Sequence, residues 1–309
     1  MPVASALPCT KVTTELLLEQ LQLCGMLGMS GNGYLVADKI LTFIKARNSA
    51  KQIIVNAIEC EPGLKNDEWL LHHRMHEIAE GIRYLSNALS ITDITLAVKE
   101  SIQITEDGFL TVKVPARFPM GEEHYLYQAV TGKSLERTVI PAKQGILIMN
   151  VQTVYQIYRM LNHVYDNQRI VTLADISSAE GRIAIIHPED QVQELLHKAF
   201  PEAKGNIYYG GGILQASQVT DQQTFGTRGG FAAFAPDSNI TNENRCRKCG
   251  GCSHKCPAGI SVHKIVQALE KDANADISAF HPEKCVHCES CTYFCMGNKI
   301  PSQYVNREI

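Results

Sequence analysis

The sequence is poor in several features that would place a protein in a special class. Its 309 residues include one tryptophan, aromatic residues make up 7%, and the formal net charge is −3. A charge this close to zero is unlike that of a nucleic-acid-binding protein, whose binding surface is strongly basic. No apolar run approaches the roughly 18 residues that cross a bilayer, so no transmembrane segment is predicted. With 45% hydrophobic and 20% charged residues, the chain has an ordinary globular composition, and its length suits about two domains.

Cysteine is scarce in most of the chain and concentrated near its C-terminal end. Of 11 cysteines, residues 1–245 contain only Cys9, Cys24 and Cys60. Disulfides usually stabilise small secreted domains, whereas these 245 residues are long enough to form a core, and the first five are unlike a signal peptide. We therefore expect a reduced, cytoplasmic protein. The three early cysteines lack ligand spacing and are predicted to be small buried hydrophobes or spare thiols.

The other eight cysteines form two runs with the same spacing, Cys-x2-Cys-x2-Cys-x3-Cys. The runs are Cys246, Cys249, Cys252 and Cys256, then Cys285, Cys288, Cys291 and Cys295. This is the spacing of bacterial [4Fe–4S] ferredoxins, in which the fourth cysteine of each run ligates the other cluster. We predict one cluster on Cys246, Cys249, Cys252 and Cys295, and another on Cys285, Cys288, Cys291 and Cys256. Zinc sites and disulfides are the alternatives.

Helical periodicity over residues 260–273, between the two runs, predicts a ferredoxin module longer and more helical than a minimal one. Two clusters in one module would form a short path for single electrons. Such a path needs a donor and an acceptor, and the first 245 residues must supply or bind one of them.

The N-terminal part alternates between helical and strand-like segments. Helices are expected near residues 16–27, 35–47 and 67–89, and strands at 52–58 and 91–98. This alternation predicts a mostly parallel sheet covered by helices. A loop containing Gly28, Gly31 and Gly33 precedes the helix that carries Lys39. Glycines at a helix N-terminus suit a phosphate, although a structural turn is the alternative.

The strand at 52–58 leads into a short acidic turn. It contains Asn56, Glu59 and Glu61, followed by Pro62 and Gly63. Ligands of α/β folds bind at the C-terminal ends of strands. The turn is therefore a candidate binding site, with a solvated acidic loop as the alternative.

These motifs, in this order, resemble the flavin-binding flavoprotein subunit of respiratory complex I. Supporting matches are Phe-Pro-Met-Gly-Glu-Glu at 118–123, Thr-Gly-Lys at 131–133, Pro-Ala at 141–142 and Asn-Val-Gln-Thr at 150–153. The nearest kin are the C subunit of Rnf electron-transport complexes and the cobalamin reductase of propanediol microcompartments. The resemblance extends over about residues 25–304. Rnf-type subunits have an additional N-terminal domain, for which the roughly 24 residues before the loop leave no room.

The resemblance implies cofactors and site residues. FMN would contact Gly28, Gly31, Gly33, Lys39, Asn56 and Asn150, while Glu59, Glu61 and Glu123 would lie near the flavin or the nicotinamide nucleotide. The chain departs from the family at Asn32, Leu35, Val36 and Ile58, where family loops have small residues, proline, threonine and an acid. These departures weaken the case for bound flavin more than the case for the fold.

Three domains are predicted: an α/β, Rossmann-like FMN- and NADH-binding domain at 1–166, a β-grasp domain at 167–236, and a helical two-cluster ferredoxin domain at 237–309. The middle domain is expected from strands near 169–173, 182–186 and 207–212 and a helix at 192–200. It resembles the soluble-ligand-binding β-grasp domain of these families.

The predicted function is that of an oxidoreductase. Electrons would pass from NADH through FMN and two [4Fe–4S] clusters to a redox partner such as flavodoxin, a reductase, a cobalamin-dependent enzyme or an Rnf-like complex. The resemblance adds microcompartment association as an alternative location, and the oligomeric state stays open. The rival hypotheses are a flavin-less two-cluster adaptor with a degenerate nucleotide site, and a binding protein whose clusters are structural or redox-sensing.

Overall fold

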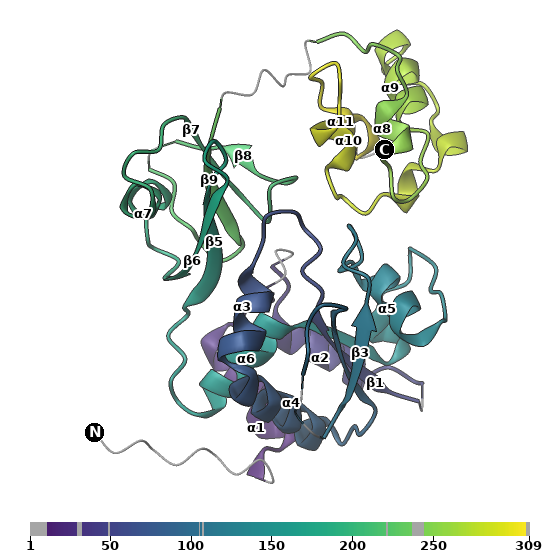
Figure 1. Ribbon diagram of the computed structural model, residues 1–309. Coiled ribbons are helices and arrows are strands. Elements are labelled where there is room, and N and C mark those ends of the chain that lie inside the picture. Colours follow the sequence, from purple (N-terminus) through teal and green to yellow (C-terminus); the bar gives the residue numbers. More distant parts are fainter. Residues whose placement is uncertain are drawn as a thin grey trace. The chain divides into compact units, whose positions relative to one another are not determined.

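The chain forms two compact units, Met1–Ala235 and Pro236–Ile309 (Figure 1). This computed structural model describes residues 11–29, 33–48, 50–104, 106, 108–220, 222–236 and 244–306. Three residues singled out from the sequence, Cys9, Gly31 and Asn32, lie outside the described residues, as does most of the expected linker at 236–244.

The first unit contains a four-stranded parallel sheet, as predicted. Its strands are β1 (Gln52–Ala57), β2 (Ile94–Lys99), β3 (Leu110–Val114) and β4 (Ile146–Asn150). Their order is β3-β2-β1-β4, and each neighbouring pair is parallel. β2 is buried along its whole length, which explains why it is an almost unbroken apolar run.

Helices cover both faces of this sheet. They are α1 (Thr14–Cys24), α2 (Val36–Ile44), α3 (Asn66–His73), α4 (Met75–Leu89), α5 (Glu123–Thr131) and α6 (Val151–Leu161), with a 3-10 turn η2 (Pro141–Gln144). Successive β1 side chains point to opposite faces. Ile53 and Val55 pack with residues of α1, α2, α4 and α6, whereas Ile54 packs with residues of α5.

The single helix expected near 67–89 is two helices. The break lies at Arg74, whose backbone angles (φ −137°, ψ 26°) are not helical. The two helices have different anchors. Glu59 accepts hydrogen bonds at the start of α3, whereas Gly81 brings α4 so close to α6 that an added Cβ would lie 2.6 Å from the Val154 carbonyl oxygen.

The first unit also contains a second, five-stranded sheet. It consists of β5 (Arg169–Asp175), β6 (Glu180–Ile186), β7 (Asn206–Gly210), β8 (Ser217–Gln218) and β9 (Phe231–Ala235), with α7 (Val192–Ala199) between β6 and β7. The order is β6-β5-β9-β7-β8, with β5 and β9 as the central parallel pair. This is a β-grasp arrangement. The sequence prediction missed β9, because its apolar residues directly follow the glycines at 229 and 230.

The second unit is helical and built around cysteines. It contains α8 (Gly251–His254), α9 (Val262–Lys271), α10 (Ser290–Tyr293) and α11 (Pro301–Val305), with 3-10 turns η3 (Ser278–Phe280) and η4 (Pro282–Lys284). The apolar face of α9 forms its core through Ile265, Val266 and Leu269. Over the stretches of chain that the structure describes, no helix has the length and apolar character needed to cross a membrane.

Candidate functional site

The eight C-terminal cysteines line two separate cavities. The Cys246 cavity is lined by Cys246, Cys249, Cys252 and Cys295. The Cys285 cavity is lined by Cys256, Cys285, Cys288 and Cys291. The fourth cysteine of each run therefore lies with the first three of the other run. Tertiary structure brings the thiols together in the two sets of four that were expected from the spacing.

The same local turn positions the first thiols of both runs. Lys248 and His287 have positive φ values of 57° and 52°, and each follows two residues after a cysteine. Their backbone N–H groups donate to Cys246 Sγ and Cys285 Sγ, both at 3.4 Å. Such N–H···S bonds stabilise negative charge on sulfur and are one of the ways in which proteins set cluster potentials.

The arrangement of the thiols fits two multi-iron clusters. Four sulfurs surround each cavity, which suits one compact [4Fe–4S] cluster with four thiolate ligands. Among the described residues, no three His, Cys, Asp or Glu side chains converge closely enough to hold a single metal ion. Burial raises the pKa of the Cys252 thiol to about 11, so cationic iron would have to favour its thiolate form.

The two cavities differ in their other residues. Arg247, His263 and Lys299 also line the Cys246 cavity. The Cys285 cavity also has a histidine, His287, but it has an acid, Glu289, and the aliphatic residues Ile260, Val262, Val286 and Val305 in place of the arginine and lysine. Lys299 is buried, with its ammonium 3.0 Å from Glu270 and its backbone N–H donating to Cys295 Sγ.

A second candidate site lies at the C-terminal edge of the parallel sheet. Asn56 near the end of β1 and Asn150 at the end of β4 are register partners on neighbouring strands. The chain leaves β1 toward β2 and β3 on one side, while β4 lies on the other. This reversal of strand order is where open α/β sheets bind ligands.

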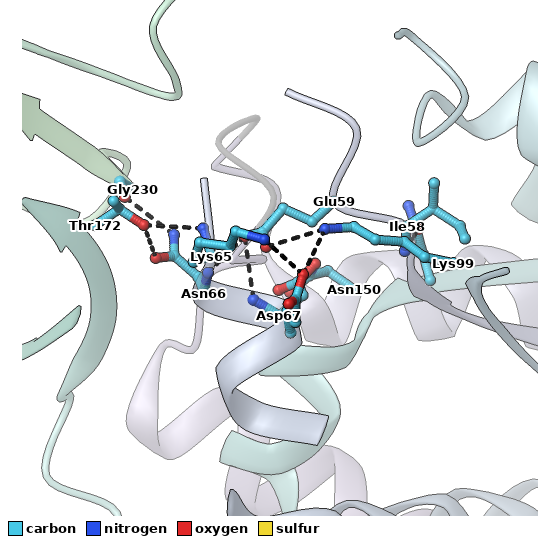
Figure 2. Close-up of polar contacts among 11 residues, drawn as sticks. Ile58, Glu59, Lys65, Asn66, Asp67, Lys99, Asn150, Thr172 and Gly230 are labelled. Carbon is cyan, nitrogen blue, oxygen red and sulfur yellow. Dashed lines mark hydrogen bonds and ion pairs between the residues drawn. The ribbon is translucent and has the colours of Figure 1, made fainter. Parts of the chain in front are cut away.

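Glu59 is buried beside this edge and holds the start of α3 (Figure 2). Its Oε1 accepts hydrogen bonds from the backbone N–H groups of Asn66, at 2.6 Å, and Asp67, at 3.1 Å. Asn150 donates to Asp67 Oδ2 at 2.9 Å. Burial raises the pKa of both acids, and the charge of Glu59 raises that of Asp67 further. Glu59 Oε2 is buried and receives no hydrogen bond from the described residues, so an acceptor is left over for a ligand.

Lys99 supplies the positive charge of this group. It ends β2, and its ammonium lies 3.8 Å from Glu59 Oε2 and 3.1 Å from Glu68 Oε2 (Figure 2). Sequence reasoning missed both Lys99 and Asp67. Lys99 could have been found from its position in the sequence. It is the last residue of an apolar strand, and this places it at the same sheet edge as Asn56.

Asn66 links the residues around Glu59 to the β-grasp sheet. Its side chain accepts a hydrogen bond from Thr172 Oγ1 at 2.8 Å and donates to the Gly230 carbonyl oxygen at 3.0 Å (Figure 2). Glu61 makes a similar link, because its Oε1 accepts the Leu214 N–H at 2.7 Å. An added Cβ at Gly212 would lie 1.9 Å from Glu61 Cγ, so this close approach requires glycine. Burial raises the pKa of Glu61 to about 7.

The glycine loop lies near the same edge. The Met29 N–H donates to Thr153 Oγ1 in the first turn of α6, the helix capped by Asn150. The Gly28 N–H donates to the Tyr34 carbonyl oxygen at 2.8 Å. Gly33 has a φ of +62°, and a Cβ there would lie 2.5 Å from Arg228 Nε. The guanidinium of Arg228, which precedes β9, thus lies against the loop, a placement that the sequence did not reveal.

Three further predicted residues contact other parts of the chain. Lys39 and Glu123 form an ion pair with 2.5 Å between Nζ and Oε1. Asn56 donates to the Gly121 carbonyl oxygen at 2.8 Å and accepts the Ile58 N–H at 3.0 Å. Through these contacts the turn at 118–123 lies against both β1 and α2, at the C-terminal edge of the parallel sheet.

Comparison with known sequences identifies two domain families. The Nuo51 FMN-binding domain matches residues 21–159, and the 4Fe-4S dicluster domain matches residues 238–296. The C subunit of an ion-translocating oxidoreductase complex from Vibrio cholerae is 28% identical, over 86% of this chain and 36% of that protein. Its counterpart from Rhodobacter capsulatus is 24% identical, over 81% of this chain and 51% of that protein. The chain is therefore similar to the C subunits of these complexes over most of its own length.

The chain spans only about a third to a half of the length of these two relatives. Among solved structures, the NAD+-reducing [NiFe]-hydrogenase in its H2-reduced state has a TM-score of 0.65 at 14% identity, covering 97% of this chain and 61% of that one. The air-oxidised state gives 0.62 at 15% identity, covering 86% and 56%. These structural matches establish the fold and, with the two domain families, confirm the predicted fold class. The families are named for FMN and for paired 4Fe-4S clusters, the cofactor classes predicted from the sequence.

Proposed function

We propose that this protein transfers electrons between NADH and a redox partner through FMN and two [4Fe–4S] clusters. The observation that carries the proposal is the gathering of eight cysteines into two cavities of four thiols, with Cys256 and Cys295 exchanged between the runs. A unit with two such cavities in the same chain as a flavin-type α/β domain suits two-electron to one-electron conversion.

The residues at the sheet edge are proposed to hold FMN. The Gly33 backbone, with Lys39 and Arg228, would supply donors and positive charge for a phosphate, and Gly28, whose N–H donates to Tyr34, would let the backbone approach it closely. Gly31, on the same loop, is proposed to contribute as well. In this proposal Glu123 holds the Lys39 ammonium in place at the loop until the phosphate shares it.

Asn56 and Asn150 are proposed to face the flavin and its ribityl hydroxyls, since amides both donate and accept hydrogen bonds. Glu59 and Glu61 are proposed to lie near the nicotinamide nucleotide, where the free Oε2 of Glu59 can accept from a ribose hydroxyl. FMN held by these residues would supply the conversion between a two-electron hydride donor and one-electron acceptors.

The redox partner is proposed to be a component of an Rnf-like complex. The support is that the relatives are named as subunits of an ion-translocating oxidoreductase complex. A flavodoxin, a reductase or a cobalamin-dependent enzyme would use the same one-electron chemistry. Predicted oxygen-sensitive clusters and reduced thiols suit a reducing compartment, and we propose the cytoplasm.

Anaerobic purification with iron, sulfide and flavin analysis tests the proposal. We expect about eight iron atoms and one FMN per chain, with loss of visible absorbance on addition of NADH. Iron without flavin, even after incubation with FMN, would contradict the flavin half and leave a two-cluster adaptor. Zinc in place of iron would contradict the cluster half.

A further inference from the structure

One wall of the Cys246 cavity reaches the protein surface. Among the described cysteines, Cys249 is the one that is exposed, while the others are buried or half-buried. Electron tunnelling weakens steeply with distance, so an exposed cluster ligand marks the shortest route between a cluster and a second protein.

The surface around Cys249 is basic. Residues 244–262 contain Arg245, Arg247, Lys248 and Lys255 and no aspartate or glutamate, and all four basic side chains are exposed. Residues 290–299 likewise contain no acid. The Cys285 cavity differs, because Glu289 lines it and the exposed Glu283 lies two residues before Cys285.

Apolar side chains next to Cys295 in the sequence are also exposed. Tyr293, Phe294 and Met296 are 48%, 43% and 68% exposed, beside Cys295 in the sequence. The rings of Tyr293 and Phe294 meet edge to face, 5.1 Å between centroids, and the Lys255 ammonium lies over the Phe294 ring at 5.1 Å.

The basic and apolar segments adjoin each other and Cys249. A Cβ added at Gly251 would lie 3.6 Å from Cys249 Sγ and 3.9 Å from the Phe294 carbonyl oxygen. One added at Gly297 would lie 3.5 Å from Arg247 Cγ. We call this surface the Cys249 face, and define it by Arg247, Lys248, Lys255, Tyr293, Phe294 and Met296.

We propose that the Cys249 face docks an acidic one-electron carrier protein, which exchanges electrons with the cluster of the Cys246 cavity. Charge complementarity selects this occupant, since the exposed cations of Arg247, Lys248 and Lys255 attract an acidic surface and repel a basic one. Exposed aromatic and methionine side chains within a charged rim are typical of the centre of a protein interface. Each encounter moves one electron, so the cluster and the carrier change oxidation state by one in opposite directions, with no bond made or broken. The inference rests on the proposed cluster function, but not on bound FMN.

Binding of a plant-type [2Fe–2S] ferredoxin, a small acidic carrier, tests the proposal. Its Kd for the cluster-loaded full chain would be measured by calorimetry at about 25 mM and about 300 mM salt. The test variant combines Arg247→Glu, Lys248→Glu and Lys255→Glu. The control combines Lys198→Glu, Lys204→Glu and Lys271→Glu, exposed lysines outside the face with the same total charge change.

At low salt we expect the test variant to bind at least about tenfold more weakly, and the control to stay within about twofold of the unaltered protein. The added salt should weaken ferredoxin binding by the unaltered protein strongly and binding by the test variant little. Phe294→Ala should weaken binding about equally at both salt concentrations, because its contribution is apolar. Iron analysis of every variant separates loss of docking from loss of a cluster.

Equal binding by the test variant and the unaltered protein, or equal weakening in test and control, would overturn the proposal. So would protection of Lys248 and Lys255 from acetylation in the free protein, because the face would then be covered by the chain itself. If FMN is absent but docking depends on the face, the flavin proposal fails and the docking proposal stands. If iron is absent, both the cluster function and the docking proposal fail.

Discussion

The two candidate sites differ in how far the chain must fold to assemble them. The eight cavity cysteines come from 50 consecutive residues, 246–295, and meet in two sets that their spacing defines. The candidate flavin residues come from Gly28 to Asn150, and Arg228 joins them from the segment that precedes β9. The thiols face cavities, whereas Lys39, Glu59 and Asn150 are already bonded to other residues of the chain.

This difference shows what local sequence can encode. Short turns with positive φ at Lys248 and His287 fix neighbouring thiols within a few residues. The nucleotide site depends instead on strand order, on a glycine at 212 and on the contact between Asn66 and Gly230. Variants in the two sites should therefore fail in different ways.

The largest expected effect separates interleaved from non-interleaved clusters. Cys246→Ala with Cys295→Ala alters one cavity, so we expect loss of about four of eight iron atoms. Cys246→Ala with Cys256→Ala alters both cavities and should remove more iron and perturb both clusters. Iron analysis and electron paramagnetic resonance of the reduced proteins would measure this. Greater iron loss from the first double variant than from the second would show that each run binds its own cluster.

The next effect concerns the phosphate end of the flavin site. Lys39→Ala and Arg228→Ala should each weaken FMN binding about tenfold, because a charge-assisted hydrogen bond to phosphate is lost. Lys45→Ala, at the other end of α2, and Arg182→Ala, an exposed arginine on β6, are the controls. FMN fluorescence titration would measure Kd. Unchanged FMN affinity in the first pair would refute this placement of the phosphate.

A smaller effect should distinguish the two clusters electrostatically. Arg247 and Lys299 line the Cys246 cavity and Glu289 lines the Cys285 cavity, so the cluster on Cys246 should have the higher reduction potential. Lys299→Met should lower that potential by on the order of tens of millivolts. The decrease is limited because Glu270 already balances the positive charge of Lys299. A redox titration followed by electron paramagnetic resonance would measure it. Lys271→Met, at the end of α9, should leave both potentials unchanged.

The smallest effect tests the link between Glu61 and the β-grasp sheet. Burial raises the pKa of this acid from 4.5 to about 7. As pH rises through this interval, the unfolded chain releases its proton first, so the free energy of unfolding falls. Glu61→Gln removes this pH-dependent loss of stability. The Tm of the variant minus the Tm of the unaltered protein should therefore be about 2 °C higher at pH 8 than at pH 5.5.

Glu122→Gln provides the opposite case. Hydrogen bonds from His124 and Arg137 outweigh burial and lower the pKa of Glu122, so its ionised form stabilises the fold above its pKa. This substitution should therefore cost more stability at pH 8 than at about pH 4. The same direction of change in both variants would contradict the assigned causes.

Sequence patterns predicted elements well where a pattern repeats locally. The strands β1 and β2 and the helix α9 appear close to where periodicity placed them. The break at Arg74 and the strand β9 were missed. The break depends on different partners for α3 and α4, and β9 is stabilised by pairing with β5 and β7.

The sequence by itself determined the cysteine-rich module, the grouping of its thiols and the mostly parallel α/β character of the first sheet. Those features follow from spacing, because backbone geometry limits where residues two or three apart can point. Only the tertiary structure decided that Arg228 lies against Gly33, that Asp67 and Lys99 join Glu59, and that Cys249 is exposed beside basic and aromatic residues. Such contacts join segments far apart in the chain, so packing rather than local propensity sets them.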